Sequence, residues 1–344
     1  MGLAATTNET ITCAPAPVFL DAVAVLRDLT AADLEAVKSE ILARAQSPVA
    51  MIPDLAKHLI NAGGKRIRPM LTLATARLFD YQGDHHIKLA ASVELIHGAT
   101  LLHDDVVDAS SLRRGAKTAN VIWGNKESVL VGDFIFSRAF ELMVAAGDLR
   151  ILQILSSASS VIAEGEVLQL STQKNIAATF EMYLAIVKAK TAALFAAATQ
   201  SGALIAGCSV AEENALRRYG QNLGIAYQLI DDALDYAGFE SALGKSVGDD
   251  FKEGKMTLPI VYAVARAREN EKSFWRRVIS EGRVKDGDFE KARMLMERDD
   301  AIEDTVACAK KYAGEALNVL SEAPQNEYTS ALANLVEASI NRGS

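Results

Sequence analysis

Apolar residues recur three and four positions apart along most of this chain. Residues with that spacing lie on one face of a helix, so the pattern predicts helices. No alternating apolar and polar run bounded by turn residues predicts a strand. We therefore expect an all-α protein with helices over residues 19–42, 52–62, 70–79, 87–107, 128–145, 149–170, 180–205, 211–236, 258–267 and 307–320.

Glycines and polar turn residues separate the predicted helices. They include Gly63-Gly64, Gly115, Gly147-Asp148 and a glycine-containing segment over residues 238–254. Since no low-complexity linker divides the chain, we expect a single domain over residues 18–344. The polar residues 1–17 are expected to form a flexible tail.

One uncharged stretch, residues 192–211, is long enough to cross a membrane. Its threonine, glutamine, serine and glycine residues dilute the apolar character. A buried core helix, or a pair of such helices, explains the stretch better. We therefore expect no transmembrane segment.

Composition restricts the function further. The 344 residues carry a net charge of −8, which argues against a general nucleic-acid binder. The three cysteines are far apart, without the spacing of a metal site or a disulfide framework. The first residues lack the basic start and continuous apolar segment of a signal peptide. These features predict a cytoplasmic protein.

Two groups of aspartates with identical spacing interrupt apolar helical stretches. They are Asp104, Asp105 and Asp108 in LLHDDVVD, and Asp231, Asp232 and Asp235 in QLIDDALDY. Like charges one helical turn apart repel by roughly 0.2–0.5 kcal/mol per pair, and burial raises that cost. Carboxylate oxygens suit Mg²⁺, which often shares its coordination shell with substrate phosphate. A solvated helix end would explain one group, but two matched groups predict metals that bridge carboxylates to a polyphosphate.

Basic residues near predicted turns are candidate anion ligands. Lys65 and Arg68 flank a helix start after Gly63-Gly64, where free N–H groups and the helix dipole attract anions. Arg113-Arg114 follows the first aspartate group within two turns, and arginine matches phosphate oxygens with a planar fork. A solvated loop and a surface ion pair are the plainer explanations.

Three further lysines lie near the aspartate groups or within apolar sequence. Lys190, followed by Thr191, interrupts an apolar helix, and could simply extend to the surface. Lys245 and Lys255 lie in GKSVGDDFKEGKMTLP, directly after the second aspartate group. The glycines of that segment would let it fold over a bound phosphate, whereas an ordinary exposed loop is the alternative.

Six motifs in order resemble those of the trans-isoprenyl diphosphate synthases, also called polyprenyl synthetases. They are GGKRIRP, ELIHGATLLHDDVVDASSLRRG, GEVLQL, KTAALF, YQLIDDALDY and GKSVGDDFKEGKMTLP, between about residues 53 and 259. The resemblance implies antiparallel helices around a deep central cavity, usually in a homodimer. It also implies head-to-tail condensation of isopentenyl diphosphate onto an allylic diphosphate with Mg²⁺.

The resemblance implies a role for each matching residue. About three Mg²⁺ ions would be held, two by Asp104 and Asp108 and one by Asp231, with Asp105, Asp232 and Asp235 assisting. The allylic diphosphate would contact Arg113, Lys190, Lys245 and Lys255. The isopentenyl diphosphate would contact Lys65, Arg68, His97 and Arg114. The oxygens of Thr191 and Gln228 would face the developing allylic cation.

Two rival functions share part of this pattern. A non-catalytic partner subunit of a prenyl synthase would have lost aspartates or basic residues, whereas this set is intact. A class I terpene cyclase would not need the isopentenyl site of Lys65, Arg68 and His97. Ala109-Ser110-Ser111 departs from the acidic residues of many relatives, but these positions flank the metal ligands without replacing them.

Product length depends on the residues before the first aspartate group. Ala99 and Thr100 are small, whereas short-chain relatives commonly place an aromatic residue there. The sequence LIHGATLLHDDVVD is most similar to octaprenyl-to-decaprenyl synthases that make quinone side chains. A shorter farnesyl or geranylgeranyl product is the alternative, if another helix closes the cavity. A long product would also imply transient membrane contact during release.

Overall fold

The computed structural model describes residues 17–61, 63–237 and 248–342, and most of these residues are helical. The all-α prediction is confirmed. The α-helices are α1 (Pro17–Leu29), α2 (Ala31–Arg44), α3 (Met51–Asn61), α4 (Ile67–Leu78), α5 (His85–Val107), α6 (Ala119–Ile122), α7 (Asn125–Ala145), α8 (Leu149–Thr172), α9 (Phe180–Val187), α10 (Ala193–Ile205), α11 (Val210–Leu234), α12 (Asp249–Glu253), α13 (Leu258–Ala265), α14 (Glu269–Trp275), α15 (Asp288–Arg298), α16 (Ala301–Ser321) and α17 (Glu327–Ile340). Two π-helical turns, η1 (Lys188–Ala192) and η2 (Arg276–Ser280), and two short strands, β1 (Leu112–Arg113) and β2 (Ala116–Lys117), also occur in the described residues.

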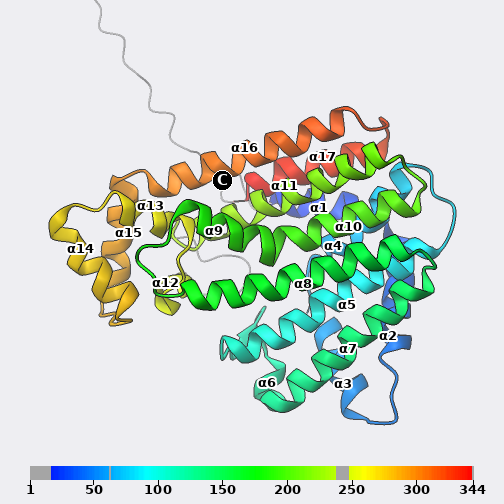
Figure 1. Ribbon diagram of the computed structural model, residues 1–344, viewed down its shortest axis with the longest axis horizontal. Helices are drawn as coiled ribbons and strands as arrows, with labels where there is room; N and C mark the ends of the chain where they lie inside the picture. Colours follow the sequence, from blue (N-terminus) through cyan, green and yellow to red (C-terminus); the bar gives the residue numbers. More distant parts are fainter. Residues whose placement is uncertain (1–16, 62, 238–247, 343–344) are drawn as a thin grey trace, which may run out of the picture.

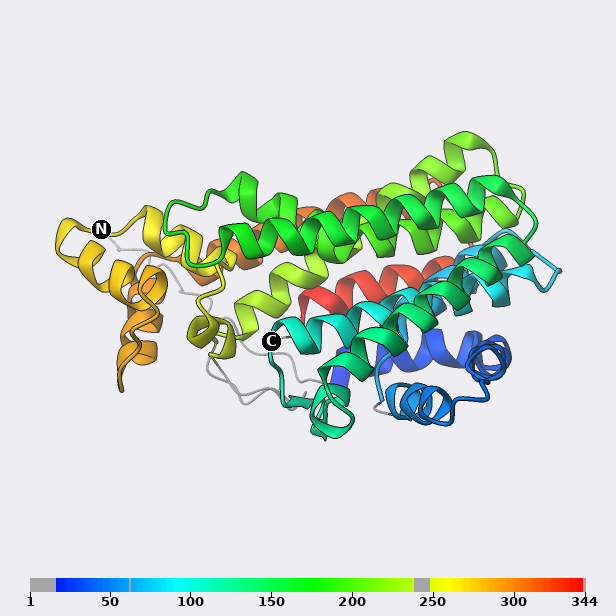
Figure 2. The ribbon, with the colours of Figure 1, turned by 60° about the horizontal axis from the view of Figure 1, so that its bottom comes forward.

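The long helices lie side by side along the longest axis of the molecule (Figure 1). α11 packs between α10 and α16, while α5 packs against α4, α7 and α10. The shorter helices α12 to α15 gather at one end, as the turned view of Figure 2 also shows. The two aspartate groups therefore belong to long helices of one bundle, α5 and α11.

The largest buried cluster joins the first and last helices of the described chain. It runs from Phe19 on α1 to Ala338 on α17, and includes Ala99 on α5 and Phe195 on α10. α1 and α17 contact each other directly. Because α1 and α17 share this core, both ends of the described chain are fixed against the bundle.

The uncharged stretch over residues 192–211 is part of the core up to residue 205, as predicted, whereas its last residues are exposed, with Val210 at 63%. It forms α10 and then a turn, after which Ser209 begins α11 through a capping box with Glu212. By length and composition, two helical stretches in the described residues could cross a membrane: Leu149–Thr172 and Phe180–Ile205. In the latter, 56% of the apolar window is buried, which identifies a core helix; in the former, α8, only 28% is buried.

The predicted helix limits need three corrections. The stretch over 19–42 is two helices, because the backbone of Thr30 leaves helical geometry with φ −109° and ψ 10° and the chain turns there. The short or highly charged helices α6, α12, α14 and α15 lie outside the predicted ranges, since such helices show weak apolar periodicity. The 14-residue helix α17, although apolar on its buried face, was also not predicted. The expected tail lies outside the described residues except for Pro17, at which α1 begins.

A small hairpin follows α5, where we expected no strand. β1 and β2 pair in antiparallel fashion, and Arg113 faces Ala116. The two residues between them, Arg114 and Gly115, have φ values of 54° and 78°. Positive φ at both central positions is the signature of a type I′ turn. This turn brings Arg114 to Gly63, before the start of α4, while Arg113 pairs with Asp105 of α5.

Candidate active site

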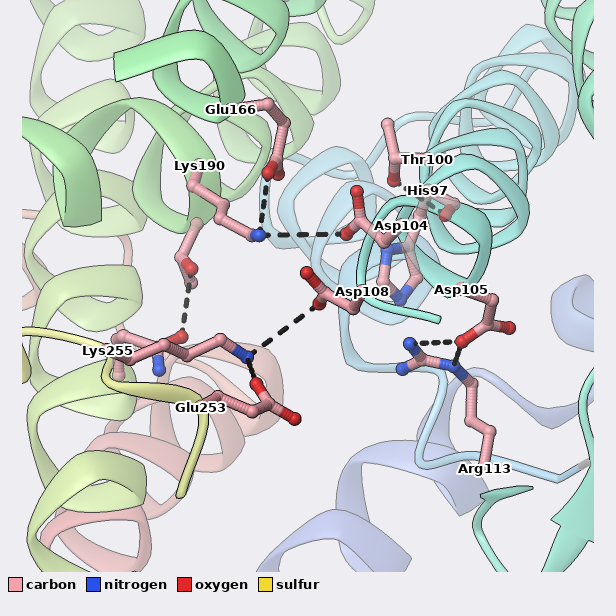
Figure 3. A network of polar contacts seen from close by, with 12 residues as sticks. His97, Thr100, Asp104, Asp105, Asp108, Arg113, Glu166, Lys190, Glu253 and Lys255 are labelled. Carbon is pink, nitrogen blue, oxygen red and sulfur yellow. Dashed lines mark hydrogen bonds and ion pairs between the residues drawn. The ribbon is translucent and has the colours of Figure 1, made fainter. Parts of the chain in front are cut away.

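Asp104 and Asp108 lie at the C-terminal end of α5 and face two lysines from other segments (Figure 3). Lys190 Nζ of η1 lies 3.8 Å from Asp104 Oδ2 and 2.7 Å from Glu166 Oε2 of α8. Lys255 Nζ, after α12, lies 3.7 Å from Asp108 Oδ2. The structure therefore brings both predicted lysines to the first aspartate group.

The electrostatic environment of Asp104 favours an additional cation. Burial raises the pKa of this carboxyl to about 6, and the Glu166 and Asp108 carboxylates act in the same direction. The Lys190 ammonium opposes the shift without cancelling it. Five carboxylates surround the ammonium groups of Lys190 and Lys255, namely those of Asp104, Asp108, Glu166, Asp250 and Glu253. A divalent cation would offset the excess negative charge.

Lys255 connects the first aspartate group to the segment after the second. Its ammonium lies 2.5 Å from Glu253 and 3.7 Å from Asp250, and these carboxylates raise the Lys255 pKa although burial opposes them. The Asp250 backbone N–H in turn donates to Asp235 Oδ2 at 3.2 Å. A chain of contacts therefore runs from α5 through α12 to α11.

The second aspartate group is linked to η1 by hydrogen bonds. Thr191 Oγ1 donates to Gln228 Oε1 at 2.9 Å, and Gln228 Nε2 donates to Asp232 Oδ1 at 2.7 Å. The Tyr183 hydroxyl donates to the other Asp232 oxygen at 2.6 Å. Burial and the nearby Asp250 raise the pKa of Asp232, although both hydrogen bonds lower it. Asp232 thus has protein partners for both oxygens, while Asp231 is more exposed.

The π-helical turn η1 places Lys190 and Thr191 next to each other on the site. Such turns inside α-helices often occur at functional sites. Gly165 allows α8 to approach η1 closely, because a Cβ there would lie 2.7 Å from Ala189 Cβ and 3.1 Å from the Lys190 backbone nitrogen. Gly165 and Glu166 are consecutive: Gly165 allows the close contact with η1, and Glu166 pairs with Lys190.

Asp105 and Arg113 form a hydrogen-bonded ion pair away from Lys190 and Lys255. Arg113 Nε and Nη2 lie 2.9 Å and 2.7 Å from Asp105 Oδ1, and only 5% of the Asp105 side chain is exposed. Figure 3 shows this pair beside the carboxylates of Asp104 and Asp108 rather than between the lysines. Asp105 therefore supports the hairpin that carries Arg113.

The residues predicted to bind isopentenyl diphosphate lie where the start of α4 meets α5 and the hairpin. Arg68 Nη1 donates to His97 Nε2 at 3.2 Å. Arg114 donates to the Gly63 carbonyl, and a Cβ on Gly64 would collide with the Arg114 guanidinium. Lys65, Arg68, His97 and Arg114 therefore meet around one glycine turn.

Burial lowers the pKa of two basic groups in this site and so disfavours their charged forms. It lowers the pKa of Lys65 to about 8, and the Arg342 guanidinium contributes to the shift. Burial and four nearby arginines, Arg68 foremost, hold the pKa of His97 well below its ordinary value. His97 is therefore neutral at pH 7 and can accept from Arg68 through one nitrogen while it donates through the other.

Several residues at the site were not singled out by the sequence pattern. Glu166 was discoverable as a carboxylate within the apolar motif GEVLQL, but Glu253, Tyr183 and Arg342 carry no local signal of their contacts. Lys245, a predicted diphosphate ligand, lies outside the described residues. Lys190 and Lys255 lie at the first aspartate group, whereas Arg113, predicted to bind the same diphosphate, pairs with Asp105 away from these lysines.

The donor set fits a metal shared with a ligand. No three His, Cys, Asp or Glu side chains within the described ranges converge closely enough to hold an ion alone. Mg²⁺ usually keeps several waters and takes one or two carboxylates together with substrate phosphates. Asp104 and Asp108, which face lysines rather than a third carboxylate ligand, match that second arrangement.

An all-α bundle with facing carboxylates and lysines defines a metal- and diphosphate-dependent class of enzyme. The family model described as "Polyprenyl synthetase" matches residues 49–296, and this chain belongs to that family. Octaprenyl diphosphate synthase of Escherichia coli (strain K12) is 43% identical over 317 residues, which cover 92% of this chain and 98% of the relative.

Two solved structures share the fold at a TM-score of 0.90. A decaprenyl diphosphate synthase from Rhodobacter capsulatus is 49% identical, with 93% of this chain and 98% of that chain covered. A polyprenyl synthase from Caulobacter crescentus CB15, complexed with calcium and isoprenyl diphosphate, is 51% identical, with coverages of 94% and 98%. The predicted family, fold type and prenyltransferase class are confirmed, and these long-chain relatives support a long-chain product.

Proposed function

We propose that this chain condenses isopentenyl diphosphate head-to-tail onto an allylic diphosphate, and repeats the step to an octaprenyl-to-decaprenyl diphosphate. One observation carries the proposal. The carboxylates of α5 and the lysines of η1 and the segment after α12 converge at one place, beside a separate group of cations at the start of α4. One location suits a metal-bound diphosphate and the other a second diphosphate.

In the proposed reaction, Asp104 and Asp108 would hold two Mg²⁺ ions and Asp231 would hold a third. Bound Mg²⁺ would neutralise the charge that develops on the departing diphosphate. Asp232 and Asp235 orient this arrangement through their contacts with Gln228 and the α12 backbone. Asp105, the remaining aspartate, acts through Arg113.

The basic residues divide between the two substrates. Lys190, Lys255 and Arg113, with Lys245, would bind the allylic diphosphate. Lys65, Arg68, His97 and Arg114 would bind isopentenyl diphosphate, with His97 as a neutral donor. The linked oxygens of Thr191 and Gln228 would stabilise the allylic cation that forms only in the transition state. The released diphosphate would accept the proton lost after condensation.

Incubation of the purified chain alone with both diphosphates and Mg²⁺ tests this function. We expect a longer isoprenyl diphosphate by mass analysis, with eight to ten isoprene units, roughly the length that the octaprenyl and decaprenyl relatives are named for. A hydrocarbon would instead indicate a terpene cyclase. No reaction would indicate a partner subunit that lacks activity alone.

We also propose that residues 18–344 form a single domain and that the chain acts as a cytoplasmic homodimer. Apolar side chains on α7 and α8 support the dimer, because Leu130, Val144 and Val167 are each more than 60% exposed. An apolar face this open favours a protein partner. A dimer that releases long-chain diphosphates, for example for quinone side chains, would contact a membrane only transiently.

A further inference from the structure

Three cations and three aromatic rings form one continuous row across the proposed isopentenyl site. In spatial order they are Lys65, Phe19, Arg342, Tyr227, Phe195 and Arg68. Lys65 Nζ lies 4.5 Å from the Phe19 ring centroid, and Arg68 Cζ lies 4.8 Å from that of Phe195. These residues come from α1, the start of α4, α10, α11 and the end of α17, so the row joins five parts of the chain.

Arg342 occupies the centre of this row and is almost fully buried. Its Cζ lies 3.7 Å from the Tyr227 ring centroid and 4.9 Å from that of Phe19, and 4% of its side chain is exposed. Nη2 donates to the Tyr227 carbonyl at 2.7 Å, and Nε donates to the Ser339 carbonyl at 3.2 Å. The guanidinium is therefore fixed by two rings and two carbonyls.

One nitrogen of this guanidinium is left for another partner. Nη1 is buried and has no hydrogen-bond partner in the part of the chain that the structure describes. It lies 3.7 Å from Asp231 Oδ1, close enough for charge attraction but beyond a hydrogen bond. Arg68 Nε is likewise buried without a hydrogen-bond partner among those residues. Buried, charged donors without partners indicate a place for an anion.

The rings explain how three like charges can be held close together. An aromatic face attracts a cation without neutralising it, whereas a carboxylate would form an ion pair and compete with a diphosphate. Phe19 and Phe195 are 4% and 1% exposed, so they also exclude water from the cations. The cations of this row therefore remain available to bind a diphosphate.

We propose that Phe19 and Tyr227 are positioning residues that hold Arg342 between Asp231 and the isopentenyl diphosphate site. The two ends of the described chain, α1 and α17, thereby become parts of the site. This inference rests on the proposed function and deepens it. Arg342 lies 3.7 Å from the Asp231 carboxylate and presents Nη1 to diphosphate oxygens, so binding at one diphosphate site is coupled to the second aspartate group.

Steady-state kinetics of four variants test the inference, beside wild-type chain assayed for product in the same experiment. Arg342→Gln should raise KM for isopentenyl diphosphate about tenfold, the loss of a charge-assisted contact. Tyr227→Leu should raise it about threefold, while Tyr227→Phe, which keeps the ring, should restore the wild-type value. KM for the allylic diphosphate should change less than twofold in each. Phe274→Leu is the matched control, because Phe274 packs against Lys291 and Arg277 in the cluster around α14 and α15.

The kinetic pattern separates positioning from packing. Equal changes in both KM values, or a Tyr227→Phe variant as impaired as Tyr227→Leu, would contradict the inference. Unchanged KM values in folded Arg342→Gln would contradict it as well, whereas failure of the wild-type chain to form product would overturn the proposed function instead. Far-ultraviolet circular dichroism and thermal melting establish that each variant is folded.

Discussion

At the residue scale, the sequence predicted which charged residues belong to the site, but not which residues they contact. The two matched aspartate groups predicted a metal and polyphosphate site, and the structure places Asp104 and Asp108 opposite Lys190 and Lys255. The direction of Asp105 could not be predicted, since its pairing with Arg113 depends on the hairpin. A helix period gives the face of a side chain, whereas a partner from another element appears only after folding.

The pKa of Lys65 leads to a pH dependence at this scale. Since burial lowers that pKa to about 8, the free enzyme loses the Lys65 charge as pH rises through 8. A neutral amine attracts diphosphate less, so kcat/KM for isopentenyl diphosphate should fall above pH 8. In Lys65→Arg the guanidinium stays protonated, and the fall should move to higher pH. An unchanged pH profile in active Lys65→Arg would assign the fall to another group.

At the element scale, long apolar helices were predicted well and local irregularities were not. α5 was expected over 87–107 and spans His85–Val107. The helix expected over 180–205 contains the π-helical turn η1, which the apolar pattern does not reveal. That turn fits where Gly165 of α8 and Gly224 of α11 let their helices approach it, so it depends on tertiary packing.

The last turns of α5 lead to a prediction about product length. Thr100 is half-buried one turn before Asp104, and Figure 3 shows both side chains, whereas Ala99 is fully buried in the core. Thr100→Phe should therefore project a ring beneath the allylic site, into the path of the growing isoprenoid chain. The ring should stop elongation early and shift the products toward roughly three or four isoprene units. Product masses measure the shift.

Two comparisons make this chain-length experiment specific. Thr100→Ser keeps the hydroxyl that donates to the His97 carbonyl at 2.8 Å, and should keep the long product. Ala99→Phe should chiefly destabilise the fold, by about 1–3 kcal/mol, because it overfills a close-packed core. Long products from active Thr100→Phe would show that another helix limits chain length.

At the scale of the whole molecule, the first and last helices matter more than their sequences suggested. α17 was not predicted, and α1 was merged with α2, yet Phe19 and Arg342 meet beside Asp231. Contacts between residues more than 300 positions apart leave no periodic signal. The exposure of apolar side chains on α7 and α8 could not be predicted either, because their apolar spacing is that of ordinary core helices.

The proposed homodimer predicts a change in mass when those faces are made polar. The chain has a mass of 36.9 kDa, so light scattering should give twice that value. Leu130→Glu places a charge where 67% of an apolar side chain is exposed, and should shift the protein toward the monomer mass. Met294→Glu on α15, equally exposed but remote from α7 in Figure 1, should leave the mass unchanged. A dimer that withstands Leu130→Glu would place the interface elsewhere.

The central claim is that the aspartates of α5 and α11 form the two halves of one metal–diphosphate clamp. Turnover of Asp104→Asn, Asp231→Asn and the double variant, each folded by thermal melting, tests it most directly. We predict that each single change lowers turnover by orders of magnitude, and that the double variant loses little more than the worse single, because groups that act as one unit are not additive. Near-normal turnover in either folded single variant would contradict the account.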